Sequence, residues 1–97
     1  MKEISVQELK EMRDKGEDFQ LIDVREEFEY EVSNLGGILI EADKISKDKP
    51  VIVQCRSGKR SAAAIMQLEQ LGYTNLYNLQ GGILAWANEI DPTISVY

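Results

Sequence analysis

Short apolar runs alternate with amphipathic stretches along the first half of the chain. Residues 5–8 have the Ser-x-x-Glu pattern of a capping box, which predicts a helix that ends before Gly16. Residues 20–24 and 37–40 are mostly apolar and predict two short strands. Between them, residues 26–35 predict a short acidic helix. The apolar residues expected to face the core from these two helices are Val6, Leu9, Met12, Phe28, Val32 and Leu35.

The second half of the chain continues this alternation. Residues 41–50 form a polar connection, and the apolar run at residues 51–54 predicts a short buried strand. Residues 59–71 predict a helix, and residues 76–79 predict a further strand. Gly81-Gly82 then turns the chain into a last helix. The residues expected on the inner stripes of these two helices are Ser61, Ala64, Ile65, Leu68, Leu71, Ile83, Trp86, Ala87 and Ile90.

Strands that alternate with helices predict one α/β domain over residues 1–97, with a parallel sheet covered by helices on both faces. Ligands of such sheets bind beyond the carboxyl ends of the strands. Cys55 follows the 51–54 strand, and Asp23 and Arg25 lie at the end of the 20–24 strand. These three residues are therefore expected at the edge of the sheet where a ligand would bind.

Composition narrows the classes of function. The net charge of −6 argues against nucleic acid or an anionic membrane as a partner. The chain has no histidine and one cysteine, which excludes Ser-His-Asp and Cys-His catalysis, imidazole zinc sites and Cys-x-x-Cys redox chemistry. No apolar run approaches the ~20 residues of a membrane span, and the N-terminus lacks a signal-peptide pattern. These features together favour a cytoplasmic location.

The segment after the 51–54 strand is the strongest candidate for chemistry. It brings the only cysteine, Cys55, into a short loop with three cations, and this loop opens onto the 59–71 helix. Cations and a helix N-terminus both stabilise a thiolate, and a loop glycine permits a turn whose amides bind an anion. These neighbours favour a nucleophile over a buried structural cysteine. The residues expected to bind the substrate are Arg56, Ser57, Gly58, Lys59 and Arg60.

Asp23 and Arg25 have two interpretations of equal weight. They could orient the Cys55 loop, or they could form an ordinary ion pair at a strand end, worth ~0–1 kcal/mol if exposed. The glutamates at positions 26, 27, 29 and 31 are expected on a solvated helix face. Trp86 is expected in the core rather than at a ligand.

The motifs resemble those of the rhodanese-like sulfurtransferase family, and in particular its small single-domain members. The resemblance is carried by residues 21–26 (Leu-Ile-Asp-Val-Arg-Glu), by the loop at residues 55–61, by Gly72-Tyr73, and by residues 78–82 with Trp86. It covers nearly the whole chain, and its specificity lies in the order and spacing of the motifs. The resemblance implies a sheet of about four to five parallel strands between two helical layers. It also implies that Cys55 carries a sulfane sulfur as a persulfide.

The chain departs from the family pattern in three places. The family usually has a Gly-His-Ile-Pro-Gly-Ala type segment where residues 33–38 read Ser-Asn-Leu-Gly-Gly-Ile. Two-domain members carry a substrate-contacting arginine at a position that matches Glu29, which weakens the expectation of efficient thiosulfate turnover. The crossover before the cysteine strand normally holds a helix, and here only residues 41–50 remain.

The leading prediction is a sulfurtransferase that moves a sulfane sulfur from thiosulfate or another persulfide donor to cyanide, a thiol or a protein acceptor. Its expected partners are a small anionic sulfur donor and an acceptor, and no metal or organic cofactor is implied. One alternative is a cysteine-dependent phosphatase or arsenate reductase. Those enzymes have five residues between cysteine and arginine, whereas four separate Cys55 from Arg60. Further alternatives are a non-catalytic binding module and an engineered deletion variant.

The 41–50 connection is expected to be the weak point of the fold. Ile45 is its only large apolar residue, so it can bury little surface and cannot hold a long crossover helix. Part of the sheet face beside the 51–54 strand would then be left uncovered. We expect either self-association or an altered course of residues 36–50.

Overall fold

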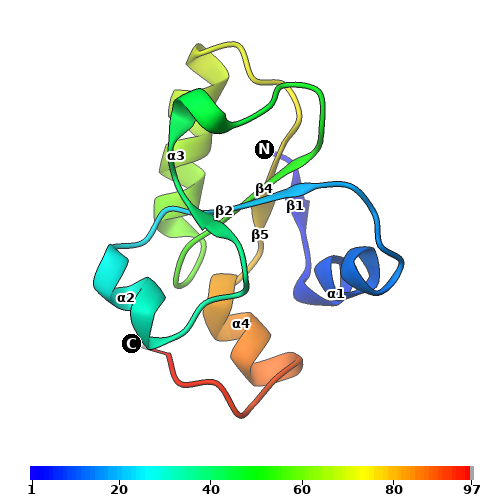
Figure 1. The fold of residues 1–97 in the computed structure, drawn as a ribbon, viewed down its shortest axis with the longest axis vertical. Helices are drawn as coiled ribbons and strands as arrows, with labels where there is room; N and C mark the ends of the chain where they lie inside the picture. The colour runs from blue at the N-terminus through cyan, green and yellow to red at the C-terminus, as the bar shows by residue number, and fades with distance from the viewer. Residues whose placement is uncertain (97) are drawn as a thin grey trace.

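Five parallel strands form one sheet in the order β1-β5-β4-β2-β3 (Figure 1). This computed structural model describes residues 1–96, and the side chain of Ala42 and the last residue of the predicted 1–97 domain lie outside that description. The strands are β1 (Glu3–Ile4), β2 (Gln20–Asp23), β3 (Ile38–Leu39), β4 (Val51–Gln54) and β5 (Leu76–Leu79). The predicted α/β fold with a parallel sheet is confirmed.

Helices cover both faces of the sheet, which gives the predicted three layers (Figure 1). They are α1 (Val6–Asp14), α2 (Glu27–Val32), α3 (Lys59–Gln70) and α4 (Gly82–Glu89), with a 3₁₀ turn, η1 (Ala42–Lys44), in the connection before β4. The predicted capping box is present at the start of α1. Ser5 Oγ accepts the Glu8 N–H at 3.1 Å, and the Glu8 carboxylate accepts the Ser5 N–H at 3.0 Å. Across residues 1–96, no helix is long and apolar enough to cross a membrane.

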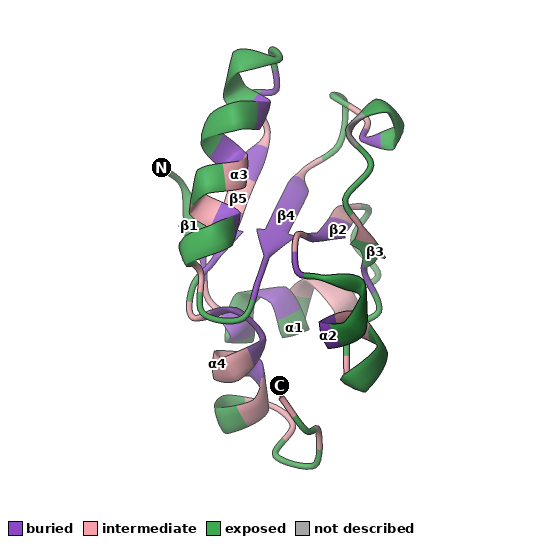
Figure 2. Ribbon diagram, turned by 90° about the vertical axis from the view of Figure 1, so that its left-hand side faces the viewer, coloured by how far each residue is buried: buried purple, intermediate pink, exposed green. Residues whose placement is uncertain are grey.

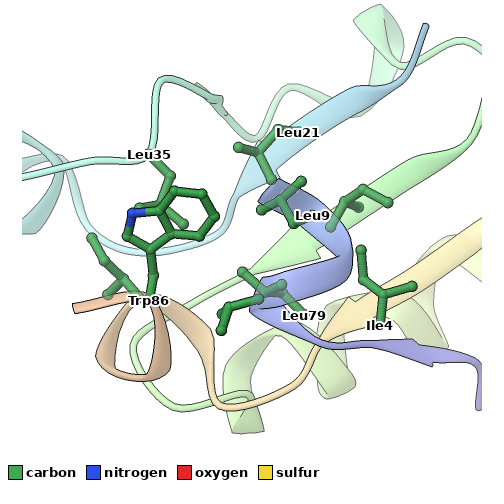
Figure 3. Close-up of a cluster of buried hydrophobic side chains, with 9 residues drawn as sticks. Ile4, Leu9, Leu21, Leu35, Leu79 and Trp86 are labelled. Carbon is green, nitrogen blue, oxygen red and sulfur yellow. The ribbon is translucent and has the colours of Figure 1, made fainter. Parts of the chain in front are cut away.

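Two apolar clusters lie on opposite faces of the sheet. One joins α1 and α4 to the strands, with Leu9 and Trp86 packed near Leu21 and Leu79 (Figure 3). The other lies under α3 and contains Ile22, Ile45, Val51, Val53, Ile65, Leu68, Tyr73 and Leu76. The central strand β4 is buried along its whole length between these clusters (Figure 2). The expectation that Trp86 belongs to the core is confirmed.

Helix α2 is oriented differently from the prediction. Phe28 and Val32 are each 51% exposed, so the predicted inward stripe is wrong at both positions. Glu29, which was expected on the solvated face, is 4% exposed. The reason is an ion pair between Glu29 and Arg60, which turns this face of α2 toward the Cys55 loop. Leu35 is buried as expected, but it lies beyond the end of the helix.

The 41–50 connection crosses the molecule without a long helix, as expected. Ile45 is buried against the α3 face of the sheet, and its carbonyl accepts the Tyr73 hydroxyl at 2.8 Å. The Gln20 side chain bonds both the N–H and the carbonyl of Ser46, at 2.8 and 2.9 Å. Residues 41–50 are therefore anchored by the buried Ile45 side chain and by polar contacts in place of helix packing.

The predicted uncovered face beside β4 is absent from the described structure, because Val51 and Val53 are fully buried. Two of the exposed apolar residues lie instead at the sheet edge, where Ile38 is 52% and Ile40 is 39% exposed. Ile38 lies on the edge strand β3 and pairs in register with Ile22. Self-association of the chain stays a prediction.

Two further details differ from the sequence prediction. Strand β1 was not predicted, because its two residues carry no periodic pattern and form a strand only by pairing with β5. Leu71 was expected on the inner stripe of α3, but it is exposed. Helix α3 ends at Gln70, and Leu71 at its C-cap turns away from the sheet.

Candidate active site

Strand β4 delivers Cys55 to the carboxyl edge of the sheet, and α3 begins four residues later. Gly58 caps α3 with a φ of 104°, a left-handed conformation that glycine adopts without strain. This turn directs the Gly58 N–H at Cys55 Sγ, 3.0 Å away. Cys55 is only 1% exposed, so its sulfur lies within the loop rather than on its surface.

Ser61 and Asn78 complete the surroundings of the sulfur. The Ser61 hydroxyl lies 3.5 Å from Cys55 Sγ, 3.1 Å from the Gly58 carbonyl and 2.5 Å from Asn78 Oδ1. The Asn78 amide donates to the same Gly58 carbonyl at 3.1 Å. A hydroxyl has one proton to donate, and a thiolate would be the only full negative charge among these acceptors. The Ser61 hydroxyl can therefore turn its proton toward the sulfur when Cys55 ionises.

These contacts lower the pKa of the Cys55 thiol. Burial is the largest single influence and raises the pKa, but four hydrogen bonds outweigh it. They come from the Ser61 hydroxyl and from the backbone N–H groups of Ser61, Gly58 and Ser57. The loop thus favours the thiolate mainly through its backbone and one hydroxyl.

The N-terminus of α4 packs against the Cys55 loop. The N–H groups of Ile83 and Leu84 donate to the carbonyls of Cys55 and Arg56, at 3.0 and 3.1 Å. This close approach requires Gly82, which has a φ of 58°. A Cβ at Gly82 would overlap the Cys55 carbonyl oxygen and lie 2.6 Å from the Arg56 carbonyl oxygen. The Gly81-Gly82 pair, interpreted from sequence as a simple turn, also allows the loop and α4 to meet.

Arg60 is held by Glu29. Its two terminal nitrogens donate to the two carboxylate oxygens of Glu29, at 2.7 and 2.9 Å. The hydrogen bond from Arg60 lowers the pKa of Glu29 to about 2, although burial works in the opposite direction. The same pair raises the pKa of Arg60, and the charges of Cys55 and Asp23 add to that effect.

Asp23 and Arg25 form a fully buried ion pair, with Arg25 NH2 2.8 Å from Asp23 Oδ2. Arg25 also donates to two carbonyls of the α2 segment, that of Ser33 at 2.8 Å and that of Glu29 at 3.4 Å. The pair thereby joins the end of β2 to α2, and α2 carries the Glu29 carboxylate that holds Arg60. Asp23 and Arg25 are therefore connected to the Cys55 loop through α2. They do not form the exposed ion pair that was the other interpretation of the sequence.

The structure brings together all of the residues predicted for the site. Arg56 and Ser57 are exposed on the loop, and Lys59 and Arg60 are exposed in the first turn of α3. Sequence reasoning missed three residues with direct contacts to this cluster, namely Glu29, Ser61 and Asn78. Ser61 had a sequence signal in its place on the first turn of the helix after the loop. Glu29 had a signal in its match to the substrate-contacting arginine of two-domain family members, whereas Asn78 is brought to the loop only by the fold.

Comparisons with a family model, with known sequences and with solved structures agree with one another. A family model described as "Rhodanese-like domain" matches residues 5–89. An Allochromatium vinosum protein named "Sulfurtransferase" is 37% identical over 87 residues, a match that covers 81% of this chain and 81% of that protein. The crystal structure of a rhodanese-like domain protein from Staphylococcus aureus matches with a TM-score of 0.81 at 28% identity, and the match covers 100% of this chain and 99% of that one.

Other relatives are longer. The Mycobacterium tuberculosis protein named "Probable adenylyltransferase/sulfurtransferase MoeZ" is 32% identical over 104 residues. The match covers 97% of this chain but 26% of that protein. The chain thus spans about a quarter of the length of this relative.

Proposed function

The chain belongs to the rhodanese-like domain family, and we propose that it is a sulfurtransferase that carries a sulfane sulfur on Cys55. The observation that carries this proposal is the cradle around Cys55 Sγ. The Gly58 N–H lies 3.0 Å from the sulfur, and the amides of Ser57 and Ser61 also favour its anion. Such a cradle stabilises both a thiolate and a persulfide anion through fixed donors.

In the first half-reaction, the Cys55 thiolate attacks the outer sulfur of the donor. A new S–S bond forms on Cys55, and the S–S bond within the donor breaks with its electron pair on the leaving group. With thiosulfate as the donor, the leaving group would be sulfite. This step needs no proton and no external electron. Because Cys55 is buried, a donor that presents its reactive sulfur as a terminal atom fits this site best.

In the second half-reaction, an acceptor nucleophile takes the outer sulfur from the Cys55 persulfide. Cyanide, a thiol or a protein thiolate could serve as the acceptor. Two half-reactions through one covalent intermediate give ping-pong kinetics. The exposed side chains of Arg56 and Lys59 would attract anionic donors to the loop.

Intact mass spectrometry tests the proposal directly. Incubation with thiosulfate or a polysulfide should add the mass of one sulfur atom to the chain, and cyanide should remove it. The Cys55→Ser variant should keep its fold but gain no sulfur. If that variant still loads and transfers sulfur, Cys55 is not the carrier.

A phosphatase activity is disfavoured by the tightness of the loop. Four residues separate Cys55 from Arg60, and the Gly58 amide already contacts the sulfur. An aryl phosphate should therefore not be turned over. Phosphate release that disappears in Cys55→Ser would count against a sulfurtransferase.

A further inference from the structure

The Glu29 carboxylate has no role in the sulfur chemistry outlined above, yet it is one of the most constrained groups of the site. It is almost fully buried and accepts two hydrogen bonds from Arg60. It also accepts the Glu26 N–H at 3.0 Å, which fixes it at the start of α2. Because the bond from Arg60 holds its pKa at about 2, Glu29 stays ionised throughout the neutral pH range.

Three buried groups beside Arg60 carry negative charge when Cys55 is a thiolate. The charges of Glu29, Cys55 and Asp23 all act on the guanidinium of Arg60 and raise its pKa. Among the described residues, Arg25 is the one buried cation, and it is paired with Asp23 at 2.8 Å. Three buried anions therefore face one buried cation before any donor enters, whereas Arg60, Arg56 and Lys59 are exposed to solvent.

We propose that Glu29 is a specificity-determining residue that neutralises Arg60 and makes the site favour sulfur donors with one negative charge over the thiosulfate dianion. This inference rests on the proposed sulfurtransferase function and names its donor class. Organic thiosulfonates (R–SO₂–S⁻) and organic persulfides (R–S–S⁻) belong to that class. An extra negative charge on the donor meets repulsion from the ionised Glu29, and Arg60 cannot offset it fully because it is already paired.

Methanethiosulfonate and thiosulfate form a matched pair of probes. In both, the Cys55 thiolate attacks a terminal sulfur, one S–S bond forms and one breaks. The electron pair leaves on methanesulfinate in the first case and on sulfite in the second. The two donors differ by one unit of charge next to the reacting sulfur, so the ratio of their kcat/KM values isolates the effect of charge.

The experiment measures kcat/KM for both donors with cyanide as the acceptor, in the wild-type chain and in Glu29→Gln. Glutamine keeps the shape of the side chain and an oxygen for the Glu26 N–H. We expect the thiosulfate-to-thiosulfonate ratio of kcat/KM to rise about tenfold in this variant. Glu27→Gln is the control, because Glu27 is exposed on the same helix and its loss changes the net charge equally. Its ratio should stay at the wild-type value.

Two outcomes would overturn the role of Glu29. If Glu29→Gln lowers kcat/KM for both donors by the same factor, Glu29 only holds the loop in place. If Glu27→Gln shifts the ratio as much as Glu29→Gln, the general surface charge is responsible.

A measurement on the wild-type chain needs no variant. Its kcat/KM should be higher for methanethiosulfonate than for thiosulfate, and a higher value for thiosulfate overturns the inference even if Glu29→Gln fails to fold. Failure of the underlying function would look different, since neither donor would then load sulfur onto the wild-type chain. If the wild-type chain loads sulfur normally but Glu29→Gln leaves the thiosulfate-to-thiosulfonate ratio unchanged, only the role of Glu29 is wrong.

Discussion

The Cys55 loop and the helix α2 meet at one ion pair, but they are held in different ways. The loop is fixed by backbone groups, since the Gly58 N–H bonds the sulfur and the first amides of α4 bond the loop carbonyls. Helix α2 is fixed by buried charged side chains, with Arg25 at its carbonyls and Glu29 against Arg60. Its large apolar residues, Phe28 and Val32, face outward.

This difference determines how each region should respond to substitution. Backbone hydrogen bonds survive most side-chain changes, but they fail where a Cβ cannot be accommodated. A buried ion pair fails when one partner is removed, because the other is left as an uncompensated charge. The loop should therefore be most sensitive at glycines, and α2 should be most sensitive at its charges.

The largest loss of stability is expected from Arg25→Met. This change leaves Asp23 buried without its partner, and loss of one member of such a pair costs about 3–5 kcal/mol. Lys10→Met is the control, because it breaks the exposed Lys10–Asp14 bridge and should cost less than ~1 kcal/mol. Urea unfolding of both variants measures the two free energies. Equal losses would show that the anchoring of α2 does not depend on the buried charge.

A second large effect is expected from Gly82→Ala, this time on the loop. The new Cβ would overlap the Cys55 carbonyl, and alanine would also be strained at a φ of 58°. We expect a loss of about 2 kcal/mol and a fall of about 100-fold in sulfur transfer, because the loop must shift from its position. Gly16 has a similar φ of 67°, but a Cβ added there would meet no atom within 4 Å. Gly16→Ala therefore measures the backbone strain without the steric overlap. Unchanged sulfur transfer in Gly82→Ala would contradict the proposed contact between the loop and α4.

The same contrast explains how much of the molecule the sequence could predict. The capping box of α1, strand β4 and the turn at Gly58 depend on neighbouring residues, and all three could be predicted. The inward direction of Glu29 could not, because its partner Arg60 lies 31 residues further along the chain. Asn78 lies 17 residues beyond Ser61, and the pairing of β5 with β4 brings the two side chains together. Local patterns specify the elements, whereas charge pairs between elements specify which face turns inward.

A smaller effect is expected on the ionisation of Cys55. The Ser61 hydroxyl is the main group that lowers the thiol pKa, so Ser61→Ala should raise the pKa toward that of the unfolded chain. The rate of alkylation by iodoacetamide as a function of pH reports this midpoint. Ser57→Ala is the control, because Ser57 lowers the pKa through its backbone N–H, which the substitution keeps.

The sign of the linked pH effect on stability follows from the lowered pKa. The folded thiol loses its proton at a lower pH than the unfolded thiol, so the folded state gains stability that is fully present above the unfolded pKa. This contribution disappears as the pH falls through the folded pKa. A Cys55 that alkylates with the same midpoint in the folded chain and in urea would contradict the role of the loop amides.

The smallest effect is expected at Val32, where the sequence pattern and the structure disagree most clearly. Val32 is 51% exposed on α2, so Val32→Ala should change stability by less than ~0.5 kcal/mol. Alanine also has the higher helix propensity, which offsets part of the lost contact. Val53→Ala makes the same chemical change at a fully buried position of β4 and should cost about 2 kcal/mol. If α2 instead turned its apolar stripe inward, the two variants would lose similar amounts in urea unfolding, and the Glu29–Arg60 pair could not hold the helix as described.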